Sequence, residues 1–164
     1  MKYTNETVRR QDRLLDEESA TQILRNGEYG FLAMQAENYG GYGLPISYVW
    51  NERNSIYLHC SPTGRKLHCI ELCNKVTFSV VGKTKVIPEK FTTAYESIIL
   101  ECNASINLPK EEKMKALELL IEKYSPDHKE IGLAYAENSF DRTEIIRLDV
   151  LNWSGKCKKI IINY

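Results

Sequence analysis

The sequence predicts a mainly β (α+β) domain, built on an antiparallel barrel or curled sheet with peripheral helices. Its 164 residues are enough for one domain with its own core, and 43% of them are hydrophobic. About six runs have strand character, and short turns join most of them as hairpins. Helical patterns occur between these runs without regular β–α–β alternation, so a doubly wound parallel sheet is not expected.

The first half of the chain predicts one helix followed by three strands. Asp16 is a suitable helix N-cap, and an apolar stripe at helical spacing follows it: Ala20, Ile23 and Leu24. Gly27 stands just past the end of this stripe. A glycine-rich turn and a second polar turn then separate three predicted strands, at residues 29–36, 44–50 and 55–60.

The second half predicts three more strands and two helices. A short helix at 67–73 precedes a β-branched strand at 75–81. The clearest alternation in the chain follows, in which one face carries Ile98, Leu100, Cys102, Ala104 and Ile106. Pro109 opens a helix with an apolar stripe, residues 127–142 are ambiguous with a short helix as one interpretation, and a last strand runs from 143 to 153.

The segment 59–67 joins a predicted strand to a predicted helix and has the composition of an anion-binding loop. Arg65 and Lys66 fall in the first helical turn, where the backbone dipole disfavours cations unless an anion lies between them. Ser61 adds a hydroxyl donor, and Gly64 lets a bound group approach the backbone. The loop favours a phosphate site, and a solvated basic turn is an equal alternative from this segment alone.

Composition limits the classes of protein to which the chain can belong. Lys and Arg number 22 and balance 22 Asp and Glu, whereas a non-specific nucleic-acid binder carries a basic surplus. No apolar run reaches about 18 residues, so no membrane span is expected. The polar start lacks the apolar core of a secretory signal, so we expect a cytoplasmic protein. Five cysteines without framework spacing predict free thiols there.

A metal site is one alternative for part of this region, because His59, Cys60, His68, Cys69 and Cys73 lie close together in the sequence. Cys69 and Cys73 are four residues apart on one helical face, as two zinc ligands can be. No Cys-x2-Cys pair occurs, however, and the same positions continue an apolar stripe, so we expect buried cysteines and no metal. His59 is equally consistent with a core histidine bonded to a carbonyl.

Four blocks of sequence, in this order and spacing, resemble one known family. They are GEYGFLA at 27–33, LPISYV at 44–49, IYLHCS at 56–61 with GRKL at 64–67, and FTTAYESII at 91–99. The chain resembles the flavin-binding split-barrel proteins related to pyridoxamine 5'-phosphate oxidase, and within them it is most similar to the nitroimidazole-resistance (Nim-type) branch. The resemblance covers residues 8–155, and its specificity comes from the four blocks together.

The resemblance implies a six-stranded antiparallel split β-barrel with peripheral helices. It also implies a homodimer that holds FMN in two equivalent clefts at the interface, with FAD as the alternative cofactor. We therefore divide the chain into an N-terminal arm (1–15), a flavin-binding split-barrel domain (16–155) and a C-terminal tail (156–164).

The same resemblance implies the residues of the flavin site. The isoalloxazine ring would lie against Pro45, Ile46, Ser47 and Tyr48. The ribityl-phosphate would be held by His59, Cys60, Ser61, Gly64, Arg65 and Lys66. A second group would complete the cleft, with Tyr95 and Ser97 near the partner chain and Trp153 over the ring. No catalytic residue is assigned, and His59 is the candidate.

The implied activity is that of an FMN-dependent oxidoreductase acting on a small organic substrate, such as a nitroimidazole or another nitro compound. A flavin needs an apolar slot, a few hydrogen-bond donors and cations for its phosphate, and these residue types are present. A flavin-binding or ligand-storage module without turnover and a metal-binding regulator are the alternatives. Glu96 stands where many relatives carry a basic residue, so that segment is not expected to contact a phosphate.

Overall fold

The structure is a computed structural model that describes residues 1–38 and 40–159. Its strands are β1 (Lys2–Tyr3), β2 (Tyr29–Ala36), β3 (Gly40–Ser47), β4 (Val49–Trp50), β5 (Ser55–Cys60), β6 (Lys75–Ile87), β7 (Thr92–Ser105) and β8 (Glu144–Lys158). Its α-helices are α1 (Glu17–Asn26), α2 (Arg65–Leu72), α3 (Lys110–Tyr124) and α4 (Lys129–Ser139).

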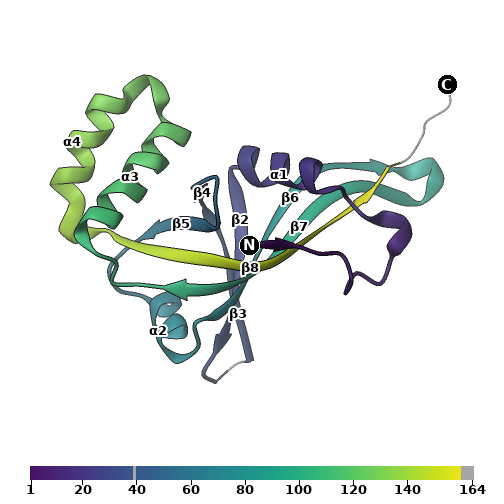
Figure 1. The fold of residues 1–164 in the computed structure, drawn as a ribbon, viewed down its shortest axis with the longest axis horizontal. Coiled ribbons are helices and arrows are strands. Elements are labelled where there is room, and N and C mark those ends of the chain that lie inside the picture. The colour runs from purple at the N-terminus through teal and green to yellow at the C-terminus, as the bar shows by residue number, and fades with distance from the viewer. Residues whose placement is uncertain (39, 160–164) are drawn as a thin grey trace.

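The strands form one curled sheet with the order β3-β2-β6-β7-β8-β5-β4, and β1 pairs with β8 off this path (Figure 1). All pairs are antiparallel except β1 with β8, which is parallel. The predicted antiparallel split-barrel class with peripheral helices is confirmed. The predicted count of six strands is wrong, since the described residues form eight and the sheet is not closed. One additional strand is β1, whose two residues are too few to show a periodicity. The other is β4, which is the end of the predicted strand 44–50, separated from β3 by an unpredicted break at Tyr48.

Local sequence explains the elements that were predicted most closely. The Asp16 carboxylate accepts the backbone N–H of Ser19 at 2.7 Å and caps α1, as predicted. The alternation along β7 is also confirmed, because Ile98, Leu100 and other inward residues are buried. Ile99 breaks the alternation and lies exposed on the outer face of the sheet.

The β6–β7 hairpin is longer than the prediction. The two strands pair from Lys75 with Asn103 to Ile87 with Thr92, through a bulge between Val81 and Thr84. Most residues between 82 and 90 are exposed, so this end of the hairpin has no apolar face. A two-stranded ribbon in solvent lacks the alternating apolar pattern from which strands are predicted.

The two end strands of the sheet, β3 and β4, are connected by the chain itself and are not paired by hydrogen bonds. The end strands β3 and β4 are separated only by Tyr48, whose backbone lies outside both ladders. Its N–H donates to the Tyr124 hydroxyl at 2.9 Å, and that hydroxyl lies 2.7 Å from the Tyr48 carbonyl and 2.6 Å from the Glu28 carbonyl. The hydroxyl has one proton, so it donates to one carbonyl at a time. The end of α3 thus satisfies the backbone at the seam of the barrel.

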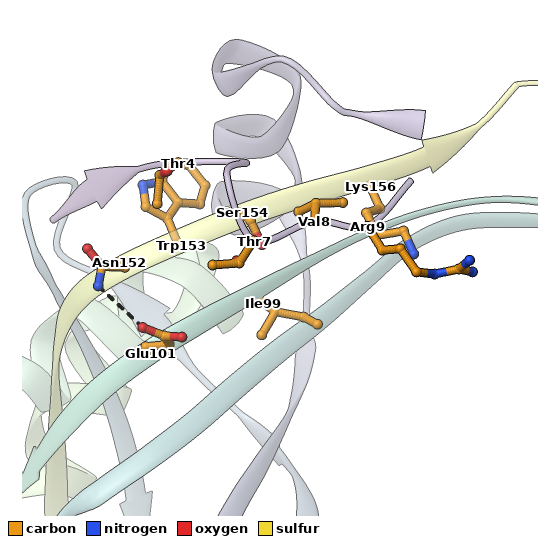
Figure 2. Close-up of a pocket in the computed structure, with 10 residues that line it drawn as sticks. All are labelled: Thr4, Thr7, Val8, Arg9, Ile99, Glu101, Asn152, Trp153, Ser154 and Lys156. Carbon is orange, nitrogen blue, oxygen red and sulfur yellow. Dashed lines mark hydrogen bonds between the residues drawn. The ribbon is translucent and has the colours of Figure 1, made fainter. Parts of the chain in front are cut away.

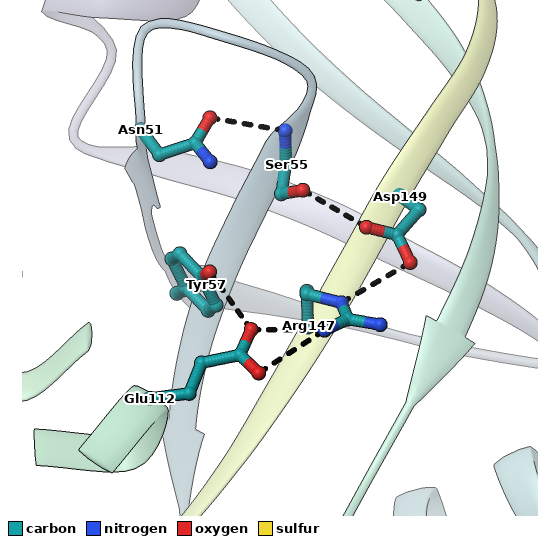
Figure 3. A network of polar contacts seen from close by, with 6 residues as sticks. All are labelled: Asn51, Ser55, Tyr57, Glu112, Arg147 and Asp149. Carbon is teal, nitrogen blue, oxygen red and sulfur yellow. Dashed lines mark hydrogen bonds and ion pairs between the residues drawn. The ribbon is translucent and has the colours of Figure 1, made fainter. Parts of the chain in front are cut away.

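A second apolar core lies outside the barrel, where α3 and α4 pack on one end of β5 and β8 (Figure 1). A half-buried polar network anchors α3 beside it, as Figure 3 shows. Arg147 donates to both carboxylate oxygens of Glu112, at 2.9 and 3.1 Å, and to Asp149 at 3.1 Å. Tyr57 donates to Glu112 at 3.0 Å, and Ser55 donates to Asp149 at 2.9 Å. The network therefore ties helix α3 to two strands.

The predicted N-terminal arm, residues 1–15, lies along β8. Lys2 and Tyr3 pair with Asn152 and Trp153, and Leu15 is buried. The last strand continues to Lys158, beyond the boundary set at residue 155. The predicted tail falls partly within this strand, and its residues 160–164 lie outside the described residues.

Candidate functional site

The predicted phosphate loop joins the end of β5 to the start of α2. Gly64 is the N-cap of α2 and adopts φ 146°, a conformation that other residues rarely take. Arg65 and Lys66 occupy the first turn, where the described structure has neither an acidic residue nor a side-chain cap. Helix α1 differs, since Asp16 caps it and two glutamates occupy its first turn. The start of α2 therefore combines two cationic residues with the positive end of a helix dipole, an arrangement that favours a bound anion.

A cation–π contact brings this helix start against the predicted ring-binding strand. The Arg65 guanidinium lies over the Tyr42 ring, with its central carbon 4.3 Å from the centroid. Tyr42 belongs to β3, the strand that also carries Pro45 and Ser47. The predicted phosphate and ring groups are thus neighbours, although about 20 residues separate them in the sequence. The sequence alone does not indicate the contact between Tyr42 and Arg65, because only the folded arrangement places the two side by side.

Strand β3 presents its residues unequally. Pro45 is exposed and Ser47 is half-buried, whereas the Ile46 side chain points into the core. The strand pairs with β2 on one side and is the last strand of the path on the other. An end strand leaves alternate N–H and C=O groups without ladder partners. The open edge of β3 can therefore offer backbone groups to a ligand.

Two of the predicted ring contacts belong to the core of this chain. Tyr48 is fully buried, its hydroxyl donates to the Leu24 carbonyl at 2.7 Å, and its backbone groups bond to Tyr124. Trp153 is 2% exposed and packs edge-on against Tyr3, at 4.9 Å between centroids. Tyr48 has no free face to place against a flavin ring, and Trp153 is almost wholly buried although it borders the cavity beside the N-terminal arm, so we assign both to packing. Their aromatic character alone could not distinguish the two roles.

His59 and Cys60 end β5 beside the phosphate loop. His59 opens into a cavity that Ser47 also lines. Although its ring is reached by solvent, partial burial and then the charge of Lys66 lower its pKa, so the imidazole is neutral at pH 7. Burial raises the pKa of the Cys60 thiol despite the opposing charge of Lys66, so this thiol stays protonated.

Tyr95 and Ser97 lie far from the loop within one chain. Ser97 precedes Ser105 by eight residues on β7, which is roughly 26 Å at about 3.3 Å per residue, and only the Ser105 end approaches the phosphate loop. Glu96, between them, accepts the backbone N–H of Lys83 at 3.0 Å and so satisfies the bulge of β6. The structure thus does not bring Tyr95 and Ser97 together with the other predicted residues of the same chain.

Several cavities have the size of small-molecule sites, and two of them border predicted residues or the N-terminal arm. The first, of about 460 Å³, lies between α3, α4 and the ends of β3 and β5, and it includes Ser47 and His59. The second, of about 340 Å³, lies between the N-terminal arm and the outer face of β7 and β8, with Arg9 and Lys156 in its lining (Figure 2). The first cavity contains predicted site residues and is the continuation of the candidate flavin site.

The fold also bears on the possibility of a metal site and of a membrane span. Within residues 1–38 and 40–159, no three His, Cys, Asp or Glu side chains come together as a group that could hold a metal ion. All five cysteines are free thiols. None of the described helices is both long enough and apolar enough to cross a bilayer.

Comparison with known proteins matches this fold to others. Residues 16–157 match the family model described as pyridoxamine 5'-phosphate oxidase. A search of curated proteins found no match. A candidate 5-nitroimidazole antibiotic resistance protein from Bacteroides thetaiotaomicron has a similar structure, with a TM-score of 0.75, 18% identity, and coverage of 88% of this chain and 86% of that one.

Two further similar structures are of proteins whose names state a cofactor. An FAD-binding protein from Mesorhizobium loti gives a TM-score of 0.59 at 18% identity, covering 90% of this chain and 98% of its own. An FAD- and heme-binding protein from Mycobacterium smegmatis gives 0.69 at 16% identity, covering 93% and 76%. At such identities these structures establish a shared fold only. The family match spans every α-helix and all strands of the sheet except β1, short of the last residue of β8, and it confirms the family indicated by the four sequence blocks. The chain belongs to the pyridoxamine 5'-phosphate oxidase family.

Proposed function

We propose that this protein binds a flavin, with FMN as the preferred form, and that it is an oxidoreductase acting on a small organic substrate such as a nitro compound. The observation that carries the proposal is the uncapped start of α2, where Arg65 and Lys66 stand beside β3. Family membership supports a flavin, and so do the names of structural neighbours that bind FAD or confer nitroimidazole resistance.

The residues present fit the phosphate and one edge of a flavin. Arg65, Lys66 and the N–H groups of the first turn of α2 would hold the phosphate, and space is open beside Gly64, where nothing lies within 4 Å of a Cβ position. The open edge of β3 at Pro45–Ser47 would take the ring through backbone groups. When bound, the flavin supplies the redox chemistry, and the chain supplies binding, orientation and a neutral imidazole at His59.

A second copy of the chain would complete the site. Tyr95 and Ser97 can meet a phosphate loop only if that loop belongs to another subunit, because much of the length of β7 separates them from the phosphate loop of their own chain. The outer face of β2, β6 and β7 also exposes four apolar side chains, each between 46% and 64% exposed: Tyr29, Phe31, Val81 and Ile99. The ladder places Phe31 and Ile99 in one row across the sheet. A homodimer that covers this face would bury them.

Sedimentation of the purified protein tests the dimer. We expect a dimer for the natural sequence and a monomer with weakened flavin binding for Ile99→Lys. Leu72→Lys is the matched control, since Leu72 is equally exposed but lies on α2 away from this face. A monomeric natural protein that still binds flavin would refute the shared site.

Absorption of the purified protein tests the cofactor directly. An oxidised flavin absorbs at about 450 nm, and heat release followed by chromatography identifies it as FMN or FAD. Titration of flavin-free protein with each form should give tighter binding of FMN, because α2 offers a single phosphate site. A protein that takes up neither form would refute the proposal.

A flavin-binding or storage module without turnover is the second candidate. It is favoured by one observation. Among the described residues, His59 is the one titratable side chain that we place beside both the phosphate loop and Ser47, so no acid–base pair for proton transfer is evident there. Anaerobic reduction of the flavin with NADH, followed by metronidazole, separates the two. An oxidoreductase should bleach and then recover its absorbance, whereas a storage module should do neither at a useful rate.

A further inference from the structure

The cavity between α3, α4 and the strand ends, here called the α3–α4 cavity, has a lining suited to one class of ligand. Its volume of about 460 Å³ lies within the range of small-molecule pockets. Its fourteen lining residues include no Asp, Glu, Lys or Arg. Most of its wall is apolar and comes from both helices, through Leu117, Leu120, Ile121, Ile131 and Ala136. A charged ligand would therefore lose its hydration there without gaining a partner.

The polar groups of the cavity are few, and some already have partners. The Ser139 hydroxyl donates to the Tyr135 carbonyl at 2.8 Å, and the Thr143 hydroxyl donates to the Ser139 carbonyl at 3.0 Å. The Tyr124 hydroxyl is committed to the seam of the barrel. The remaining polar side chains of the lining are the imidazoles of His59 and His128 and the hydroxyls of Ser47, Ser125 and Tyr135, each of which can both donate and accept, the imidazoles when neutral.

Exposed aromatic and apolar side chains also line the mouth of the cavity. Ile131 and Tyr135 on α4 are each 72% exposed, although both line it. Helix α4 approaches α3 closely here, since a Cβ on Gly132 would lie 2.8 Å from the Ile121 side chain. The small residue brings the helices together and leaves the larger side chains along the opening. A flat apolar molecule entering between them would cover this surface.

The cavity adjoins the candidate flavin site through two shared residues. Ser47 follows Pro45 and Ile46 on β3, and His59 ends the strand that leads into the phosphate loop. A ligand in the cavity would therefore lie beside the edge of β3 to which we assign the flavin ring.

We propose that the α3–α4 cavity binds the organic substrate, and that this substrate is a small uncharged aromatic molecule with a hydrogen-bonding group at one edge. The aromatic part would lie against the apolar walls of α3 and α4, and the polar edge would meet His59 or His128. This inference rests on the proposed flavin function, because it names the substrate class of the same site.

Calorimetric titration of the FMN-loaded protein with two matched probes tests the substrate class. 2-Naphthol and 2-naphthoate share the same rings, but at pH 7.5 the first is neutral and the second is a carboxylate. We expect 2-naphthol to bind at least tenfold more tightly. Ile131→Glu should weaken 2-naphthol about tenfold, by removing apolar contact and adding a charge at the mouth. Leu72→Glu, on an exposed apolar residue outside every cavity described above, should change the affinity less than twofold.

A second variant distinguishes loss of ligand binding from loss of folding. Ser139→Leu adds carbon atoms to the cavity wall and removes only a hydroxyl bonded within α4. It should also weaken 2-naphthol at least tenfold, with the flavin absorbance unchanged. Equal binding of the two probes, or full affinity in both variants, would overturn the inference while leaving flavin binding intact. Selective binding of 2-naphthol by a protein that takes up no flavin would overturn its role as substrate and the proposed function together.

Discussion

Removal of both cations at the start of α2 gives the sharpest test of the phosphate site. In Arg65→Ala/Lys66→Ala the loop and the N-cap glycine are kept, and the phosphate loses two charge-assisted hydrogen bonds. Such bonds are worth about 1.5–3 kcal/mol each. Because Arg65 is exposed and Lys66 is only half-buried, we take the lower value for both, or about 3 kcal/mol together. This corresponds to a loss of about two orders of magnitude in FMN affinity.

The assay is a fluorescence titration of flavin-free protein with FMN and with riboflavin, which lacks the phosphate. The natural protein should bind FMN about a hundredfold more tightly than riboflavin, and the double variant should bind the two alike. Arg53→Ala/Lys115→Ala removes the same two charge types from exposed positions outside the cavities and should behave as the natural protein. If the double variant at α2 kept its preference for FMN, or retained its flavin through dialysis, the phosphate would have to lie elsewhere.

Four further predictions concern the fold. Gly30→Ala should destabilise the protein by about 1–3 kcal/mol in urea unfolding, because its Cβ would lie 2.1 Å from a core phenylalanine, whereas Gly41→Ala, with nothing within 4 Å, should be nearly neutral. Tyr124→Phe should cost about 1–3 kcal/mol by leaving a backbone N–H at the seam unpaired, without changing the far-ultraviolet spectrum. Arg147→Ala should lower Tm by roughly 3–6 °C, for a loss of about 1.5 kcal/mol. Burial alone would raise the pKa of Glu112, but the hydrogen bonds from Arg147 and Tyr57 lower this pKa below 4.5. The stability advantage of the natural protein over Glu112→Gln should therefore be complete above pH 4.5 and decline as the pH falls through the lowered pKa.

Local signals were sufficient wherever a segment had one buried face. Asp16 predicted the start of α1, and the alternation from Ile98 predicted β7. The same rule explains the failures, since residues 82–86 in the outer part of the β6–β7 hairpin are mostly exposed, and β1 is shorter than any period. The pattern over α4 is consistent with a short helix but does not establish one, because Ile131 and Tyr135 are exposed apolar residues that blur it.

The candidate site was predictable in part for a different reason. The phosphate loop is contiguous in sequence, so its cations and glycine could be identified together. The α3–α4 cavity is assembled from β3, β5, two helices and the start of β8, and no local pattern connects these segments. Tyr124 ends an apolar stripe and looks like a packing residue, yet its hydroxyl holds the seam of the barrel. Trp153 shows the converse, since a residue expected to cover a ligand instead fills the core.

The position of β8 has a consequence for how the chain folds during synthesis. Strand β8 lies between β7 and β5 and also pairs with β1. These three strands therefore cannot complete their pairing until the segment that begins at residue 144 has been synthesised. Until that segment leaves the ribosome, β5 and β7 each expose an unpaired edge, and the first residues of the chain have no partner. The nascent chain therefore depends on late, long-range pairing, the kind that folds slowly and exposes edges to aggregation. Loss of the last strand by truncation or frameshift should leave an insoluble product rather than a weakened flavoprotein.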